Sequence, residues 1–129
     1  MKGDGVSWIG VDFDGTLSIG GLKLQDGRLV LEPGTPVWPM VARVRRWLAE
    51  GRTVKIFTAR VSEAATRPDF TAAQIAVVQA FCREHIGTEL EVTCVKDFGC
   101  TELWDDRARR VEYGTGLEYN AIVNLEETV

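Results

Sequence analysis

Polar residues suited to phosphate chemistry follow four apolar segments of the sequence, each at the point where the segment ends. They are Asp12 with Asp14, Thr58, Lys96, and Asp105 with Asp106. Carboxylates can bind a cation or attack phosphorus, and a hydroxyl or an ammonium can stabilise charge on phosphoryl oxygens. If the four segments are parallel strands, their carboxyl ends lie along one edge of a sheet, where ligands bind. The spacing therefore predicts one site built from residues far apart in the chain.

The segments before these residues have the composition of strands, rich in β-branched and aromatic side chains. The predicted strands span residues 6–13, 53–57, 90–95 and 101–104, with a short last strand at 121–123. Between residues 22 and 31, apolar and polar residues alternate around an Asp-Gly pair, which predicts a β-hairpin. We interpret this hairpin as a small flap.

Two helices are predicted between the strands. The first ends at Gly51 and has apolar residues spaced three and four apart from Met40 onward. The second continues toward Gly87, and its start has the spacing of a capping box with a hydrophobic staple. The residues in that pattern are Thr71 with Gln74, and Phe70 with Ile75.

The alternation of strands and helices predicts an α/β fold with a Rossmann-like, mostly parallel sheet, because parallel strands need crossover connections. We expect helices on both faces of the sheet, in a single three-layer α/β/α domain over residues 1–129. The chain has 129 residues, of which 45% are hydrophobic, enough for one core but not for two domains of ordinary size.

Composition and charge disfavour several classes of protein. No apolar run is long enough to cross a bilayer, and the first residues do not form a signal segment, so we expect a cytoplasmic protein without a membrane partner. The three cysteines have no close cysteine or histidine neighbours and predict neither a disulfide framework nor a zinc site. The net charge of -4 disfavours nucleic acid as a partner without excluding it.

The order of the strand-end residues resembles the motifs of the haloacid dehalogenase-like superfamily. Residues 9–17 contain Asp12-Phe13-Asp14-Gly15-Thr16 after an apolar strand, which is similar to the Asp-x-Asp-x-Thr of the first motif. Thr58 resembles the second motif, Lys96 the third, and Asp105 with Asp106 the acidic fourth. The resemblance spans the chain from residue 9 to residue 106.

The resemblance implies a role for each of these residues. Asp12 is the expected nucleophile, and Asp14 the expected general acid and base for the leaving alcohol and the attacking water. Thr58 and Lys96 are expected to act in catalysis by contacting the phosphoryl group. Gly15, which allows a close turn at the strand end, and Arg60 are further candidates for binding substrate.

Carboxylates crowded at one site repel one another, so a cation is expected among them. Magnesium prefers hard oxygen ligands and combines one or two carboxylates with water and phosphate oxygens. The resemblance implies carboxylate ligands from Asp12 and Asp105 and a backbone carbonyl from Asp14. Asp106 is expected to bind Mg2+ either directly or through another ligand.

The resulting expectation is a Mg2+-dependent phosphohydrolase that cleaves phosphate monoesters of small molecules, nucleotides among them, through an aspartyl-phosphate. The gaps between the motifs leave no room for a cap domain, so the crevice is expected to be open except where the flap covers it. Two alternatives stay open. One is a phosphatase of a macromolecule such as a polynucleotide end, which predicts a basic rim, and the other is a non-catalytic module that binds metal or phosphate.

Each candidate also has an ordinary explanation. Asp105 and Asp106 could cap a short helix that begins at Arg107, and arginines on helices are usually solvated. His85 lies near the end of a predicted helix, and we expect it to have a structural role and no role in catalysis. The four tryptophans are expected in the core or at its edge, and Trp38, near the flap, is the one candidate among them for a substrate contact.

Overall fold

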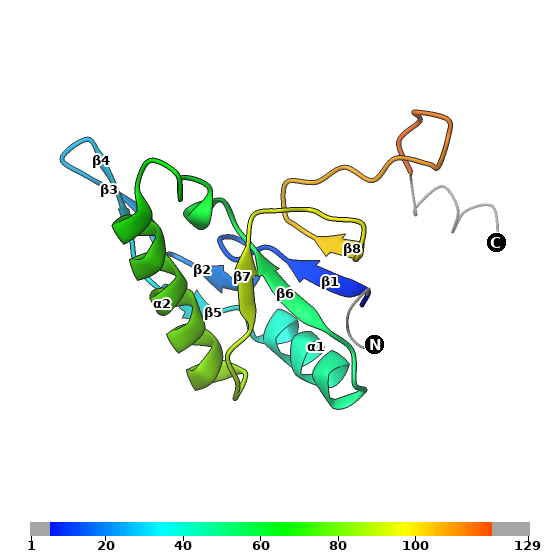
Figure 1. Cartoon of the computed structure of the whole chain (residues 1–129), viewed down its shortest axis with the longest axis horizontal. Coiled ribbons are helices and arrows are strands. Elements are labelled where there is room, and N and C mark those ends of the chain that lie inside the picture. Colours follow the sequence, from blue (N-terminus) through cyan, green and yellow to red (C-terminus); the bar gives the residue numbers. More distant parts are fainter. Residues whose placement is uncertain (1–5, 120–129) are drawn as a thin grey trace.

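A parallel sheet of four strands forms the centre of the protein in this computed structural model, which describes residues 6–119 (Figure 1). The strand order is β7-β6-β1-β8. The strands are β1 (Trp8–Val11), β6 (Val54–Phe57), β7 (Glu91–Thr93) and β8 (Cys100–Trp104). This sheet confirms the predicted α/β class, and a strand overlaps each of the four predicted ranges, but β7 ends at Thr93, before the predicted end at residue 95. The predicted strand at 121–123 lies outside the described residues.

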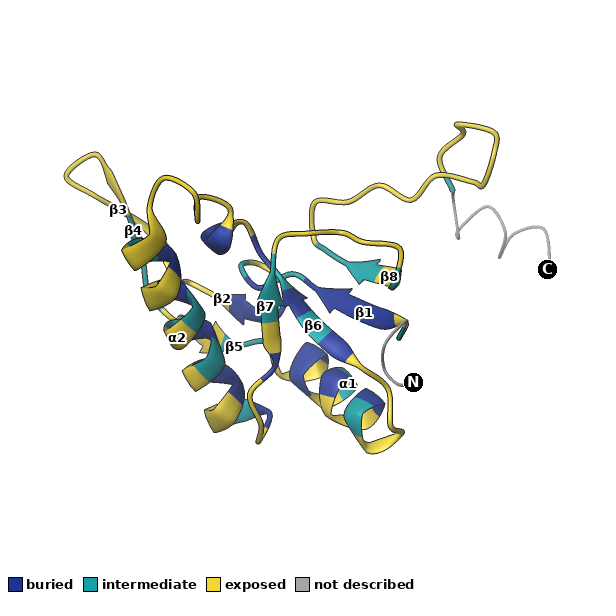
Figure 2. Ribbon diagram, viewed as in Figure 1, coloured by how far each residue is buried: buried dark blue, intermediate teal, exposed yellow. Residues whose placement is uncertain are grey.

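Strand β1 lies between β6 and β8 and is buried along its whole length (Figure 2). Its register places Val11 beside Ile56 of β6 and Trp104 of β8. A strand with neighbours on both edges satisfies its backbone groups within the sheet, so an almost wholly apolar segment fits there. The end of β1 is therefore fixed on both sides.

Helices α1 (Trp38–Ala49) and α2 (Pro68–His85) pack on the same face of the sheet. One continuous core contains Ile9 and Val11 of β1, Ile56 of β6, and the buried side chains of both helices. Side chains alternate along a strand, so the side chain of Trp8 points to the other face. The core thus lies between the sheet and the two helices.

The order of the strands explains why both helices share a face. The chain passes from β1 to β6 through α1 and from β6 to β7 through α2, two steps in the same direction. Right-handed crossovers that step in one direction put their helices on one side. The next connection, residues 94–99, crosses to β8 without a helix, so residues 6–119 form two layers. The expected third layer stays a prediction.

The connection 94–99 covers the second face of the sheet at Trp8, which is 2% exposed. The indole Nε1 of Trp8 donates to Asp97 Oδ1 at 2.8 Å, and the same oxygen accepts the Gly99 N–H at 2.8 Å. These two hydrogen bonds are the largest causes that hold the pKa of Asp97 below its usual value. The ammonium of Lys55 lies 4.8 Å from the centre of the Trp8 ring. Residues 94–99 therefore lie against the sheet.

Strands β3 (Leu22–Gln25) and β4 (Arg28–Leu31) form the predicted hairpin. Asp26 and Gly27 connect them with φ values of 52° and 75°, as a two-residue hairpin turn requires. At its base lie the short strands β2 (Ser18–Ile19) and β5 (Thr35–Pro36), which pair antiparallel. The hairpin is thus a separate two-stranded unit beside the main sheet.

The predicted capping box at the start of α2 is wrong. The helix begins at Pro68, with Arg67 as its N-cap residue, and the Thr71 N–H already donates to the Arg67 carbonyl at 3.0 Å. Proline fits the first helical position because its φ is fixed there and it needs no N–H partner. Thr71 and Gln74, with Phe70 and Ile75, therefore lie inside the helix.

No helix among residues 6–119 is long and apolar enough to cross a bilayer.

The position of Thr71 predicts that its hydroxyl adds no stability. Thr71 is 5% exposed, and its Oγ1 has no hydrogen-bond partner among the described residues. We expect Thr71→Val to leave the free energy of unfolding unchanged or to raise it by about 1 kcal/mol, because a buried unsatisfied hydroxyl is removed. Urea denaturation measures the change. A loss of about 1 kcal/mol, as for a capping residue, would contradict this interpretation. The control, Thr16→Val, removes a hydrogen-bonded hydroxyl and should be destabilising.

Candidate functional site

The candidate site lies where β1 and β8 end side by side. Asp12 directly follows β1, and Asp105 and Asp106 directly follow β8. The Asp12 N–H donates to the Trp104 carbonyl at 2.9 Å, which fixes the two strand ends together. The chain leaves β1 toward β6 and returns later to β8 on its other edge. Such a point, where the strand order reverses, is where open parallel sheets bind ligands.

Three carboxylates meet at this point. Asp12, Asp105 and Asp106 each place one oxygen so that the three oxygens lie within 4.8 Å of one another. No lysine or arginine among residues 6–119 forms an ion pair with any of the three. Hard oxygen donors grouped in this way suit a divalent cation such as Mg2+, although the donor set is not specific for it. The residues present thus fit the expected metal.

Burial and crowding raise the pKa of Asp12 to about 7. Burial is the largest cause, and the charge of Asp105 and the hydrogen bond and charge of Asp106 add to it. A hydrogen bond from Thr16 acts in the opposite direction. A cation at the three oxygens would relieve the same repulsion and favour the ionised carboxylate.

Thr16 and Gly15 shape the turn that brings Asp106 against Asp12. The Thr16 hydroxyl accepts the Asp106 N–H at 3.1 Å and lies 3.3 Å from both Asp12 Oδ2 and Asp106 Oδ1. Gly15 has φ of 89°, and a Cβ there would lie 2.7 Å from Asp106 Oδ2. Glycine is therefore needed both for the backbone and for the space that the Asp106 carboxylate occupies.

Asp14 faces Arg60 and is not part of the group of three carboxylates. The Arg60 Nε donates to Asp14 Oδ2 at 2.8 Å, and Arg60 Nη2 donates to Asp14 Oδ1 at 2.7 Å. Arg60 also donates to Gln74 Oε1 at 3.0 Å and to the Glu32 carbonyl at 2.7 Å. Its guanidinium lies over the Phe13 ring, 4.9 Å from the centre.

Arg60 therefore supports the site from within. Its side chain is 2% exposed, against 17% for that of Asp14. Sequence reasoning proposed Arg60 as a substrate contact, and the structure places it at the cavity wall with its guanidinium donating to Asp14, Gln74 and Glu32. Its signal in the sequence was only its position two residues after Thr58.

Thr58 lines the cavity and caps the short helix η1 (Ala59–Val61). The Thr58 Oγ1 accepts the Arg60 N–H at 3.1 Å, and the side chain is almost fully buried. Its hydroxyl proton is still available to a ligand, because the bond to Arg60 uses only the acceptor. The structure thus brings Thr58 to the same cavity as Asp12 and Asp14.

Lys96 is not brought to this cavity. It lies exposed in the connection 94–99, and Cys94 lines the cavity in its stead. Arg107, which sequence reasoning took for a solvated helix residue, does line the cavity. No helix starts there, since the Arg107 N–H donates to Asp105 Oδ1 at 2.8 Å in a local turn. Its place directly after the acidic pair is the signal that could have identified it.

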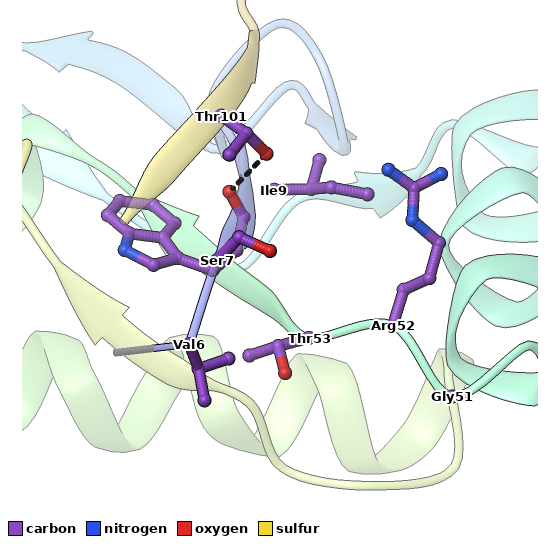
Figure 3. A pocket seen from close by; sticks show the side chains of 8 residues that line it. Val6, Ser7, Ile9, Gly51, Arg52, Thr53 and Thr101 are labelled. Atoms are coloured by element: carbon purple, nitrogen blue, oxygen red, sulfur yellow. Dashed lines mark hydrogen bonds between the residues drawn. The ribbon is translucent and has the colours of Figure 1, made fainter. Parts of the chain in front are cut away.

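The cavity has a volume of about 640 Å³ and both polar and apolar lining residues. Its lining includes the carboxylates, Thr58 and two arginines, and also the apolar side chains Leu22, Leu29, Leu31 and Phe57. A second cavity of about 260 Å³ lies at the opposite ends of β1 and β6 (Figure 3). Its lining includes Arg52 and Thr101 but no carboxylate, and the Thr101 hydroxyl donates to the Trp8 carbonyl at 3.3 Å. The larger cavity is the candidate site.

The raised pKa of Asp12 predicts that the metal-free protein loses stability as pH rises. Between the unfolded value of 3.8 and the folded value of about 7, the folded state binds more protons, so this contribution to stability falls across that range. Asp12→Asn should lack this pH dependence of stability and should be more stable than the wild type at about pH 8. Mg2+ should stabilise the wild type more at about pH 8 than at about pH 5. Urea denaturation with and without EDTA measures both, and a wild type as stable as the variant without metal at the higher pH would refute the prediction.

Removal of Arg60 should destabilise the fold strongly. Arg60→Met leaves the Asp14 carboxylate partly buried without its partner, and we expect a loss of about 3 kcal/mol or more in the free energy of unfolding. The matched control is Arg52→Met, which breaks the half-exposed pair with Glu102 at 3.0 Å and should cost less than about 1 kcal/mol. Urea denaturation compares the two, and equal losses would show that the Arg60 network does not hold the site together.

Comparison with protein-family models, with curated proteins and with solved structures gave no match for this chain. Its function is therefore inferred from the geometry of the site itself.

Proposed function

We propose that the protein is a Mg2+-dependent phosphohydrolase that cleaves phosphate monoesters through an aspartyl-phosphate on Asp12. The observation that carries this proposal is the meeting of Asp12, Asp105 and Asp106 at the ends of neighbouring parallel strands, at the wall of a 640 Å³ cavity. The motif resemblance of residues 12–16 is consistent with the same chemistry. Sites of this size commonly hold small molecules.

Asp12 is the proposed nucleophile. One of its oxygens forms a bond to phosphorus while the ester P–O bond breaks, and the leaving alcohol takes up a proton. Water then attacks phosphorus, which releases phosphate and restores the carboxylate. Bound Mg2+ would neutralise the carboxylates and polarise phosphate oxygens. Asp12 lies at the end of a strand that is paired on both sides, so its carboxylate is held in place for attack.

Asp14 is proposed to donate the proton to the leaving alcohol and to accept one from water. Both of its oxygens accept a hydrogen bond from Arg60, and each oxygen keeps a further lone pair that can take up a proton. Arg60 also contacts Gln74, Glu32 and the Phe13 ring, and these contacts hold the guanidinium, and with it the carboxylate, at the cavity wall.

Thr58 and Arg107 are the proposed contacts for phosphoryl oxygens. Thr58 can donate its hydroxyl proton, and Arg107 adds a positive charge at the cavity wall. Lys96 would need movement of the connection 94–99 to take this role. A Rossmann-like three-layer architecture and a cytoplasmic location remain parts of the proposal that come from the sequence.

The charges at the cavity favour a small substrate over a macromolecular phosphate. The cavity is lined by four aspartates and two arginines, which is not the basic rim expected around a polynucleotide end. A non-catalytic module would keep the metal site without turnover, and measurement of both metal binding and hydrolysis separates it from an enzyme.

Hydrolysis of an aryl phosphate tests the proposal directly. We expect turnover that requires Mg2+ and that falls by at least about 10³-fold in Asp12→Asn, because the nucleophile is removed. The matched control is Asp69→Asn, the same change at an exposed position in the first turn of α2, which should keep full activity. Undiminished turnover in a folded Asp12→Asn would exclude the mechanism. Mg2+ binding to the wild type without any turnover would favour the binding module.

A further inference from the structure

The hairpin presents four leucines on one face. The register of β3 and β4 places Leu22 opposite Leu31 and Leu24 opposite Leu29. Residues directly opposite or two apart on paired strands share a face, so all four side chains point the same way. None of the four belongs to the hydrophobic core, and Leu22, Leu24 and Leu29 are 45%, 77% and 63% exposed. This leucine face is thus an apolar surface that the described residues leave largely uncovered, with only Leu31 half-buried.

Three of these leucines form a wall of the candidate site. Leu22, Leu29 and Leu31 line the same cavity as the carboxylates, together with Phe57, while Leu24 near the hairpin tip does not line it. A ligand without an apolar group would leave these leucine side chains exposed to water. Apolar surface inside a site contributes to binding when a ligand removes it from water.

The leucine face is held at a fixed position relative to the carboxylates. Arg60 binds both Asp14 and the Glu32 carbonyl, and the Glu32 N–H donates to the Gly21 carbonyl at 2.8 Å, which closes the base of the hairpin. A Cβ at Gly21 would lie 2.4 Å from the Glu32 oxygen and 2.8 Å from Arg60 Nη2, so the backbone packs directly against this network. The apolar wall is therefore built into the site by the same arginine that holds Asp14.

We infer that the site selects phosphate monoesters whose alcohol part is apolar, with the phosphate at the carboxylates and the apolar group against Leu22, Leu29 and Leu31. This inference rests on the proposed function and specifies its substrate class. The cavity of about 640 Å³ has room for a phosphate and a medium-sized apolar group together. Sugar phosphates, whose hydroxyls would face the leucines, are expected to be poor substrates.

A series of n-alkyl phosphates from ethyl to octyl tests this selectivity. For each ester, kcat/KM is measured with Mg2+, and the Kd of the matching n-alkyl phosphonate, which cannot be hydrolysed, is measured by calorimetry. We expect kcat/KM to rise and Kd to fall by up to about fourfold per methylene, the factor that corresponds to about 0.8 kcal/mol, until the wall is covered.

Two exposed leucines of the same face provide the variants. Leu29→Ser removes a side chain that lines the cavity and should reduce the dependence on chain length by at least half. Leu24→Ser makes the same change on the same face outside the cavity and should keep the wild-type dependence. Since both side chains are exposed, both variants should fold.

The outcomes separate this inference from the proposed function. Mg2+-dependent turnover with no dependence on chain length, or equal effects of Leu29→Ser and Leu24→Ser, would overturn the inference and leave the hydrolase intact. Absence of turnover with every ester, together with phosphonate binding that tightens with chain length and weakens in Leu29→Ser, would support the apolar wall and overturn the hydrolase. Phosphonate binding that is independent of chain length would overturn the inference whatever the turnover.

Discussion

The guanidinium of Arg60 joins the parts of the protein that surround the cavity. It binds Asp14 after β1, the Glu32 carbonyl at the base of the hairpin and Gln74 on α2, and it lies over the ring of Phe13 in the core. A planar group with donors in a fixed fork can make such contacts only in one arrangement of its partners. The positions of the hairpin, of α2 and of the strand end therefore depend on one another through a single buried side chain.

The same arginine divides the acidic residues into two groups with different electrostatics. Asp14 has a bidentate partner, whereas Asp12, Asp105 and Asp106 have none among residues 6–119, and the pKa of Asp12 rises to about 7. Asp12, Asp105 and Asp106 therefore form a local concentration of negative charge. That difference favours a cation at the three carboxylates and a separate role for Asp14.

The sequence allowed prediction of the strands, the hairpin and the convergence of Asp12 with Asp105 and Asp106, because strand-end residues must meet at one edge of a parallel sheet. It did not allow prediction of where Lys96 lies. From β7 to β8 the chain crosses three inter-strand spacings, about 14 Å, and returns to the amino end of the sheet. The seven steps from Thr93 to Cys100 reach at most about 25 Å, so the connection, which passes over Trp8 and turns at Asp97–Cys100, leaves no room for a helix. Likewise, the spacing of Gln74 predicted a capping residue, but its side chain accepts a hydrogen bond from Arg60. Local spacing in the sequence does not reveal this long-range contact.

Because Lys96 lies outside the cavity, the positive charge that a phosphate needs there must have another source. Under the proposed function, a phosphate dianion must approach four aspartates, and of these only Asp14 is neutralised by an arginine. Arg107 is exposed to solvent, where its attraction is screened, and Lys96 lies outside the cavity. The cation would then contribute to binding of the ester as well as to breaking of the bond. The leucine face supplies what the charges do not, an attraction for the ester that is independent of its phosphate.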